Sequence, residues 1–187
     1  MIQLLALCGS LRRQSLNAMV LRALKRVAPE NIQIELYPSL GDLPLFNPDI
    51  EDTNLLSIVD LRDAIIQADG VIIASPEYAR GVSGVMKNAL DWMVGNESFV
   101  NKPVMLLNAS PRAHHALDAL HLTLLTMSAK VIDDAYVAIQ IMGTTLNEDD
   151  IVNDAIIAGS LRKALETFCN EIGRVNNTPV FPISPMP

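Results

Sequence analysis

Short apolar runs alternate along this chain with segments whose apolar residues recur at helical spacing. The runs with strand character cover residues 2–8, 32–37, 71–74, 104–107 and 130–139. Strands that are apolar on both faces are buried on both faces, and in a β–α alternation they predict a parallel sheet between layers of helices. The second run alternates apolar and polar residues, which is typical of a strand near a sheet edge.

Helical spacing predicts five helices, at residues 16–27, 54–68, 84–94, 113–128 and around 161–172. Right-handed crossovers between the strands then predict a doubly wound α/β fold. We expect a flavodoxin-like, five-stranded parallel sheet in the order 2-1-3-4-5, with helices on both faces. In such a sheet, ligands bind beyond the carboxyl ends of the strands.

The length of 187 residues suits a single domain, which we expect at residues 1–175. Residues 176–187 form a tail that contains prolines at positions 179, 182, 185 and 187. Proline does not continue a helix, so this tail is expected to be loose or to lie along a neighbouring subunit.

Acidic side chains outnumber basic ones, 21 to 14, which gives a formal net charge of −7. Nucleic acids and anionic membranes are bound by clustered Lys and Arg, so this balance argues against both as partners. The apolar runs are far shorter than the ~20 residues that span a membrane, and the chain start does not resemble a leader. Cys8 and Cys169 are too few for a disulfide framework. We therefore expect a cytoplasmic protein.

The turn after the first strand is rich in hydrogen-bond donors. Ser10, Ser15 and Asn17 are short polar side chains, and Arg12 carries a guanidinium that forms charge-assisted hydrogen bonds. The helix that follows begins with backbone N–H groups that lack internal partners and attract an anion. Together these groups predict a phosphate site that needs no metal. The alternative is that Ser15 only caps the helix and the arginines are solvated.

Better-known phosphate motifs do not match this turn. The glycine patterns of dinucleotide-binding and P-loop proteins are missing. A phosphotyrosine-phosphatase loop requires an arginine six residues after its cysteine, but Gln14 stands six residues after Cys8. Cys8 follows four apolar residues, a setting in which cysteine is usually an inert buried side chain.

The loop after the third strand begins with a proline that restricts the backbone, and it also contains two glycines and an aromatic residue. Pro76 stiffens the strand end, and Gly81 and Gly84 allow the backbone to approach a ligand. Tyr78 is one of three tyrosines, and its ring is suited to stack beside a flat heterocycle. The alternative is that Tyr78 only anchors the loop; Trp92 is expected to be ordinary core.

The two loops together resemble the NADPH-dependent FMN reductase family, which includes quinone, azo-dye and chromate reductases. The resemblance is carried by Gly-Ser-Leu-Arg-x-x-Ser-x-Asn at residues 9–17 and Pro-Glu-Tyr-x-x-Gly-x-Ser-Gly-x-x-Lys-Asn-Ala-Leu-Asp-Trp at 76–92. It implies an FMN site in which one group of residues binds the phosphate, a second group borders the isoalloxazine ring, and one further residue completes the lining. The phosphate of FMN would be held by Ser10, Arg12, Ser15, Leu16 and Asn17; the isoalloxazine would be bordered by Pro76, Glu77, Tyr78 and Ala79, and Ser110 would complete the site.

The chain departs from the family pattern in two places. Many members have Asn where Ala79 stands, which removes a polar contact expected near the flavin. Many also have a Gly-Gly pair shortly after the serine that corresponds to Ser110, where this chain has Pro-Arg-Ala-His-His at 111–115. Bulkier residues there are expected to affect the choice of acceptor more than flavin binding.

The resemblance implies an NAD(P)H-dependent oxidoreductase with tightly bound FMN. NADPH or NADH would be the co-substrate, and the acceptor would be a small molecule such as a quinone, an azo compound or chromate. No acid–base side chain is needed, because the flavin carries the chemistry. A homodimer or homotetramer is also implied. Two alternatives stay open: a flavin-binding sensor or electron-transfer module that acts on a protein partner, and a flavin-less scaffold. His114, His115 and His121 have no metal-ligand spacing, so no metal is expected.

Overall fold

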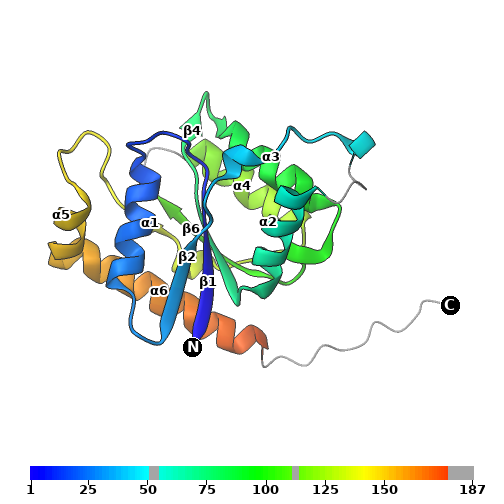
Figure 1. Ribbon diagram of the computed structural model, residues 1–187. Helices are drawn as coiled ribbons and strands as arrows, with labels where there is room; N and C mark the ends of the chain where they lie inside the picture. The colour runs from blue at the N-terminus through cyan, green and yellow to red at the C-terminus, as the bar shows by residue number, and fades with distance from the viewer. Residues whose placement is uncertain (51–54, 111–113, 177–187) are drawn as a thin grey trace.

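The structure is a computed structural model that describes residues 1–50, 55–110 and 114–176 (Figure 1). Three expectations fall partly outside these ranges: the start of the second helix at residue 54, the departure at residues 111–113, and the tail from residue 177 onward.

A parallel sheet forms the centre of the molecule (Figure 1). Its first four strands run in the order β2 (Ile32–Leu36), β1 (Ile2–Cys8), β3 (Gly70–Ala74) and β6 (Pro103–Asn108). Every pairing among them is parallel. The predicted α/β class and the order of these four strands are therefore confirmed.

The fifth strand was predicted as one segment over residues 130–139, and this was wrong. The structure has two short pieces, β7 (Lys130–Val131) and β8 (Val137–Ala138), and each pairs in parallel with β6. A 3-10 helix at Asp133–Ala135 separates them. Two adjacent aspartates favour a turn over a strand, and this interruption follows from them.

Helices cover both faces of the sheet, as predicted (Figure 1). One face carries α1 (Leu16–Val27), α5 (Glu148–Asn153) and α6 (Ala155–Asn176). The other face carries α2 (Leu56–Gln67), α3 (Gly84–Val94) and α4 (His114–Thr126). The acidic run at residues 148–150 indicates a helix start, and α5 begins there, although it is not among the five helices predicted from helical spacing. It is short, and its start depends on an N-terminal capping box in which Asn147 and Asp150 bond each other's backbone N–H groups.

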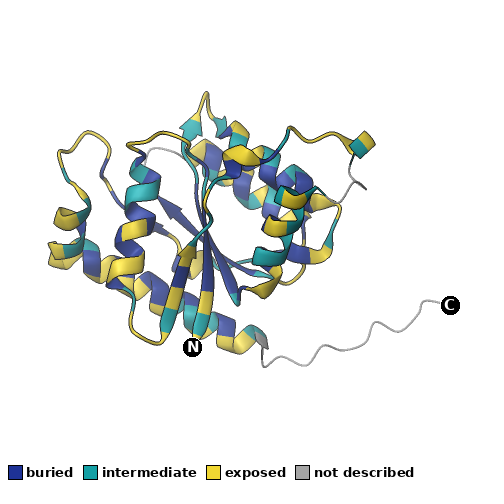
Figure 2. Cartoon of the chain, in the orientation of Figure 1, coloured by how far each residue is buried: buried dark blue, intermediate teal, exposed yellow. Residues whose placement is uncertain are grey.

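Two hydrophobic cores lie on the two faces of the sheet. Along β1, Leu4 and Ala6 belong to one core, and Leu5 and Leu7 belong to the other. This follows from the strand period of two, which sends successive side chains to opposite faces. Figure 2 shows the consequence, because the central strands are buried and the outer surfaces of the helices are exposed.

Four shorter elements complete the described part of the chain. Three are 3-10 helices at Leu40–Asp42, Pro48–Ile50 and Glu97–Phe99. The fourth is a hairpin of β4 (Glu77–Tyr78) and β5 (Gly81–Val82), inserted between β3 and α3. Within the described ranges, no helix is long and apolar enough to cross a membrane.

Candidate functional site

A groove lies at the carboxyl ends of β1, β3 and β6, the edge at which ligands bind in folds of this kind. Nine of the ten predicted site residues line it, and Ala79 does not. The side chains around the groove come from four segments. They are Ser10, Arg12, Ser15, Leu16, Asn17, Pro76, Glu77, Tyr78, Asn108, Ala109, Ser110 and Met142.

The turn between β1 and α1 forms the first wall. Gly9 N–H donates to the carbonyl of Ala74 at 2.8 Å, which ties the end of β1 to the end of β3. A Cβ on Gly9 would lie 2.5 Å from Ser75 Oγ and 2.8 Å from Ser83 Oγ. A side chain at this position would therefore require Ser75 and Ser83 to shift. The close approach places the following residues over the strand ends.

Polar groups of this turn are held in position by local hydrogen bonds. Ser15 Oγ accepts from Ala18 N–H at 3.2 Å and caps α1, so the capping role considered for Ser15 is real. Ser15 also lines the groove, and the cap does not exclude a role in binding. Ser10 Oγ accepts from Arg12 N–H at 3.4 Å. The Arg12 side chain is exposed and makes no ion pair within the described residues.

Asn17 stands out because it is buried and has an unpaired oxygen. The residue is 7% exposed, and its Oδ1 has no hydrogen-bond partner among the described residues. A buried polar atom without a partner costs free energy, so such groups nearly always have a protein, water or ligand partner. Because Asn17 lines the groove, a bound molecule is in position to supply that partner.

Cys8 lies just behind this wall. Its Sγ is 3.7 Å from the carbonyl oxygen of Ser10 and 3.9 Å from Ser15 Oγ. It does not line the groove, so the thiol contributes to the packing of the turn.

The hairpin of β4 and β5 forms the second wall. Tyr78 is 51% exposed and lines the groove. The two turn residues, Ala79 and Arg80, have φ angles of 50° and 61°. Positive φ at both central positions defines a type I′ turn, in which Asn followed by Gly is preferred. Ala79 therefore lies at the tip of the hairpin, away from the groove lining, at a position whose backbone favours asparagine.

Glu77 fixes this hairpin to α4. Its Oε2 accepts a hydrogen bond at 3.0 Å from the backbone N–H of Ala116, in the first turn of the helix. A carboxylate at this position pairs an N–H group that has no partner within the helix, and it interacts favourably with the helix dipole. No local sequence pattern indicates this contact, because the two residues are 39 positions apart.

The end of β6 and the segment after β8 supply the rest of the lining. Asn108 Oδ1 accepts from Ser110 N–H at 3.0 Å, and the carbonyl of Asn108 accepts from Ile139 N–H at 2.8 Å. Sequence reasoning missed Asn108, Ala109 and Met142. A polar residue at the end of an apolar strand marks Asn108, but no local pattern marks Met142.

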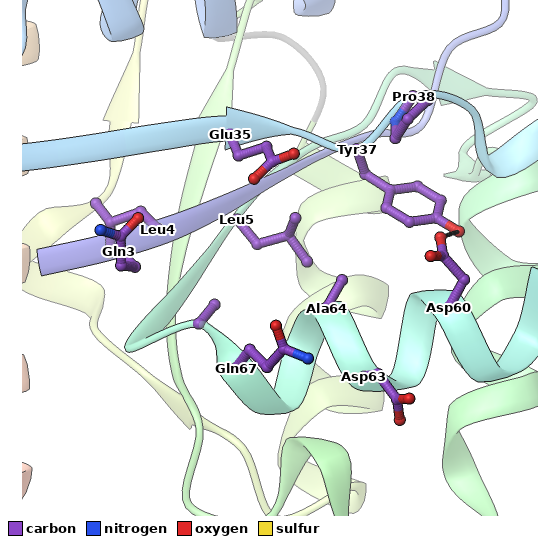
Figure 3. Close-up of a pocket in the computed structure, with 11 residues that line it drawn as sticks. Gln3, Leu4, Leu5, Glu35, Tyr37, Pro38, Asp60, Asp63, Ala64 and Gln67 are labelled. Carbon is purple, nitrogen blue, oxygen red and sulfur yellow. Dashed lines mark hydrogen bonds between the residues drawn. The ribbon is translucent and has the colours of Figure 1, made fainter.

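A second cavity, of about 510 Å³, lies between the edge strand β2, β1 and α2 (Figure 3). Tyr37 points toward Asp60 across one end, and its hydroxyl donates to Asp60 Oδ2 at 3.0 Å. Burial and then this hydrogen bond raise the pKa of Tyr37 to about 12. None of the predicted site residues lines this cavity.

The histidines are used in local contacts. The rings of His114 and His115 lie 4.2 Å apart at the start of α4, although neighbours on a helix generally point apart. His121 Nε2 lies 3.0 Å from Asp133 Oδ1. Among the described residues, no group of three or more His, Cys, Asp or Glu side chains is arranged to hold a metal ion.

Comparison with known proteins agrees with this geometry. A quinone reductase of Pseudomonas putida KT2440 is 36% identical over 137 residues, which cover 68% of this chain and 73% of that protein. A quinone reductase of Escherichia coli K12 is 38% identical over 113 residues, or 58% of this chain. The match spans only 60% of the length of the E. coli protein.

The fold also has close counterparts among solved structures. FerB, a flavoenzyme NAD(P)H:(acceptor) oxidoreductase from Paracoccus denitrificans, matches with a TM-score of 0.83 and 29% identity. The match covers 93% of this chain and 98% of that one. A family model described as NADPH-dependent FMN reductase matches residues 2–143, which include both predicted motifs and all four segments of the groove. This chain therefore belongs to the NADPH-dependent FMN reductase family.

Proposed function

We propose that this protein is an FMN-dependent NAD(P)H oxidoreductase that passes electrons to a small acceptor such as a quinone, an azo compound or chromate. One observation carries the proposal: the donor-rich turn after β1 and the hairpin with Tyr78 line one groove. A phosphate site and an aromatic side chain along a single groove suit a molecule with a phosphate at one end and a flat ring at the other.

The residues present fit FMN in three respects. Arg12, Ser10 and Ser15 provide a cation and hydroxyl groups for a terminal phosphate. Asn17, expected at the phosphate, also brings a buried, unpaired side-chain oxygen; this atom accepts a hydrogen bond, so a ribityl hydroxyl would satisfy it. Gly9 lets the turn after β1 pack closely against Ser75 and Ser83, beside the end of β3.

Each wall has a distinct task in this proposal. The β1–α1 turn binds the phosphate and supplies affinity far from the reacting ring. Pro76, Glu77 and Tyr78 border the ring, and Glu77 keeps the hairpin against α4. Bound FMN supplies the hydride and electron chemistry, while the protein orients it and excludes water. We assign no acid–base side chain.

We also propose that the active form is a homodimer or homotetramer. The groove encloses only about 120 Å³, less than the roughly 300–1,000 Å³ of pockets that bury a drug-sized ligand. A flavin ring would extend beyond it, and a second subunit would cover the exposed part. Leu122 and Leu125 are exposed on α4, which supports such an association. We place the protein in the cytoplasm, where NAD(P)H is available and its two free cysteines stay reduced.

The test is an acceptor screen on FMN-loaded protein. NADPH or NADH oxidation is followed by the loss of its near-ultraviolet absorbance, with a benzoquinone, an azo dye and chromate in turn. We expect turnover with at least one acceptor. Flavin binding without turnover on any of them would point to the electron-transfer module instead, and a colourless protein that binds no FMN would refute the proposal.

A further inference from the structure

We propose that Met142 is a positioning residue for the cofactor: its side chain closes the groove from the side of α5 and slows the release of FMN. This inference rests on the proposed function, and it concerns a residue outside both recognised motifs.

The first support is the placement of exposed apolar surface around the groove. Among the apolar residues that line it, Tyr78 and Met142 are the two that are more than half exposed, at 51% and 54%. They come from different segments, the β4–β5 hairpin and the segment at residues 139–147 that links β8 to α5. A ligand that fills the groove would remove apolar surface of both residues from water, and each contact would strengthen binding.

The second support is that the main chain beside Met142 is held in place. Ile141 is 1% exposed, and its N–H donates to the carbonyl of Ala109 at 3.5 Å, beside the groove floor. The side-chain amide of Gln140 donates to the carbonyl of Met142 at 2.7 Å. Gly143 follows with a φ of +84°, a left-handed conformation that glycine adopts readily.

The far end of the same segment is also anchored. Arg22 Nε lies 2.7 Å from Glu148 Oε2, and Arg26 Nη1 lies 2.7 Å from Asp149 Oδ1 and 3.2 Å from Glu148 Oε1. These ion pairs join α5 to α1, the helix whose first turn belongs to the phosphate site. The segment therefore spans from the end of the sheet to α1 with both ends fixed, and Met142 lies between them.

The chemistry of methionine suits this position. Its thioether is polarisable, and its unbranched side chain adapts to an irregular surface and makes favourable contacts with aromatic rings. Leucine would keep the apolar volume and lose the sulfur, whereas alanine would remove most of the contact.

The test compares FMN binding by the wild type, Met142→Ala and Met142→Leu, using equilibrium dialysis for Kd and release after dilution for the dissociation rate. We expect Met142→Ala to raise Kd about 2- to 10-fold, mostly through faster dissociation, and Met142→Leu to stay within about two-fold. Ile156→Ala is the matched control, because it removes an exposed apolar side chain of α6 that does not line the groove.

Three outcomes are distinguishable. If the wild type and Met142→Ala bind and release FMN equally, the role of Met142 is wrong and the proposed function stands. If the wild type binds no FMN, both fall. If Met142→Ala binds FMN weakly, a thermal melt without FMN that matches the wild type shows that the loss is local and supports the role. A lowered melting temperature moves the decision to Met142→Leu and to the control. FMN binding near the wild type in Met142→Leu supports the role, and a loss of binding in Ile156→Ala as large as that in Met142→Ala overturns it.

Discussion

Arg12 is the charged side chain that we propose contributes most to binding the phosphate. It lines the groove, it is exposed, and within the described residues no acidic side chain pairs with it. Arg12→Ala should weaken FMN binding by about 1.5–3 kcal/mol, the range for a hydrogen bond to a charged group. A fluorescence titration should therefore show Kd rising about 10- to 150-fold.

The chain supplies its own control for this experiment at the next position. Arg13 carries the same charge and is exposed, but it does not line the groove. Arg13→Ala should change FMN affinity by less than about three-fold, through long-range attraction alone. Equal losses in the two variants would mean that net charge, rather than a contact of Arg12, governs binding.

Tyr37 gives a prediction about pH, because burial and the hydrogen bond to Asp60 raise its pKa to about 12. In the unfolded chain a tyrosine loses its proton near pH 10. Between these two pKa values, the folded chain keeps a proton that the unfolded chain has lost. The stabilisation that Tyr37 contributes is therefore complete below about pH 10 and is lost as the pH rises through about 12. Urea unfolding should show the wild type losing its advantage over Tyr37→Phe between about pH 10 and 12. An advantage that stays constant over this range contradicts the assignment.

At the scale of elements, the β4–β5 hairpin has a turn residue with a strained backbone, and a substitution can relieve this strain. Arg80 has a φ of 61°, a left-handed conformation that costs an L-residue roughly 1–2 kcal/mol. Arg80→Gly should stabilise the fold by about 0.5–1 kcal/mol, because part of the gain is lost to the greater freedom of glycine in the unfolded chain. Urea unfolding measures this change. Arg80→Ala removes the same side chain but keeps the Cβ, so it should give no such gain; equal stabilisation in both variants would show that the charge, not the backbone, was responsible.

Sequence reasoning worked best where burial dictates the residue types. The strands β1, β3 and β6 are buried on both faces, and their unbroken apolar runs could be recognised directly. The last strand could not, because β7 and β8 have two residues each and depend on pairing with β6 for their form. The β4–β5 hairpin was missed for a related reason, since its turn residues, Ala79 and Arg80, lack the Asn-Gly signature of a type I′ turn.

The candidate site divides in the same way. Ser10, Arg12 and Asn17 lie within one turn, so a contiguous motif predicted that they act together. Met142 joins them only because β8 ends beside β6, and the hydrogen bond from Ile141 to Ala109 joins residues far apart in the chain. Tertiary contacts of this kind leave no local pattern to read.

At the scale of the whole molecule, the groove exists because three parallel strands end at one edge of the sheet. Side chains of β1 alternate between the two cores, so both helix layers fix its position and that of the turn after it. A ligand in the groove contacts the ends of β1, β3 and β6 and the segment that leads to α5. Binding there should therefore stabilise the fold as a unit, because unfolding of any of these segments destroys the site.

Thermal unfolding with FMN and with riboflavin tests this coupling and the phosphate site together. FMN at about 100 times its Kd should stabilise the folded state by about 2.7 kcal/mol. For a chain of 187 residues, this corresponds to a rise in Tm of about 5–11 °C. Riboflavin has the same ring and ribityl chain but no phosphate, so it would lack the contacts that we propose between the phosphate and Arg12 and the α1 N-terminus. If its Kd is about 100-fold higher, the same concentration gives only about 0.4 kcal/mol and a shift of about 1–2 °C. Equal shifts with the two flavins would place the binding energy on the ring alone, and the turn after β1 would then have no role in holding a phosphate.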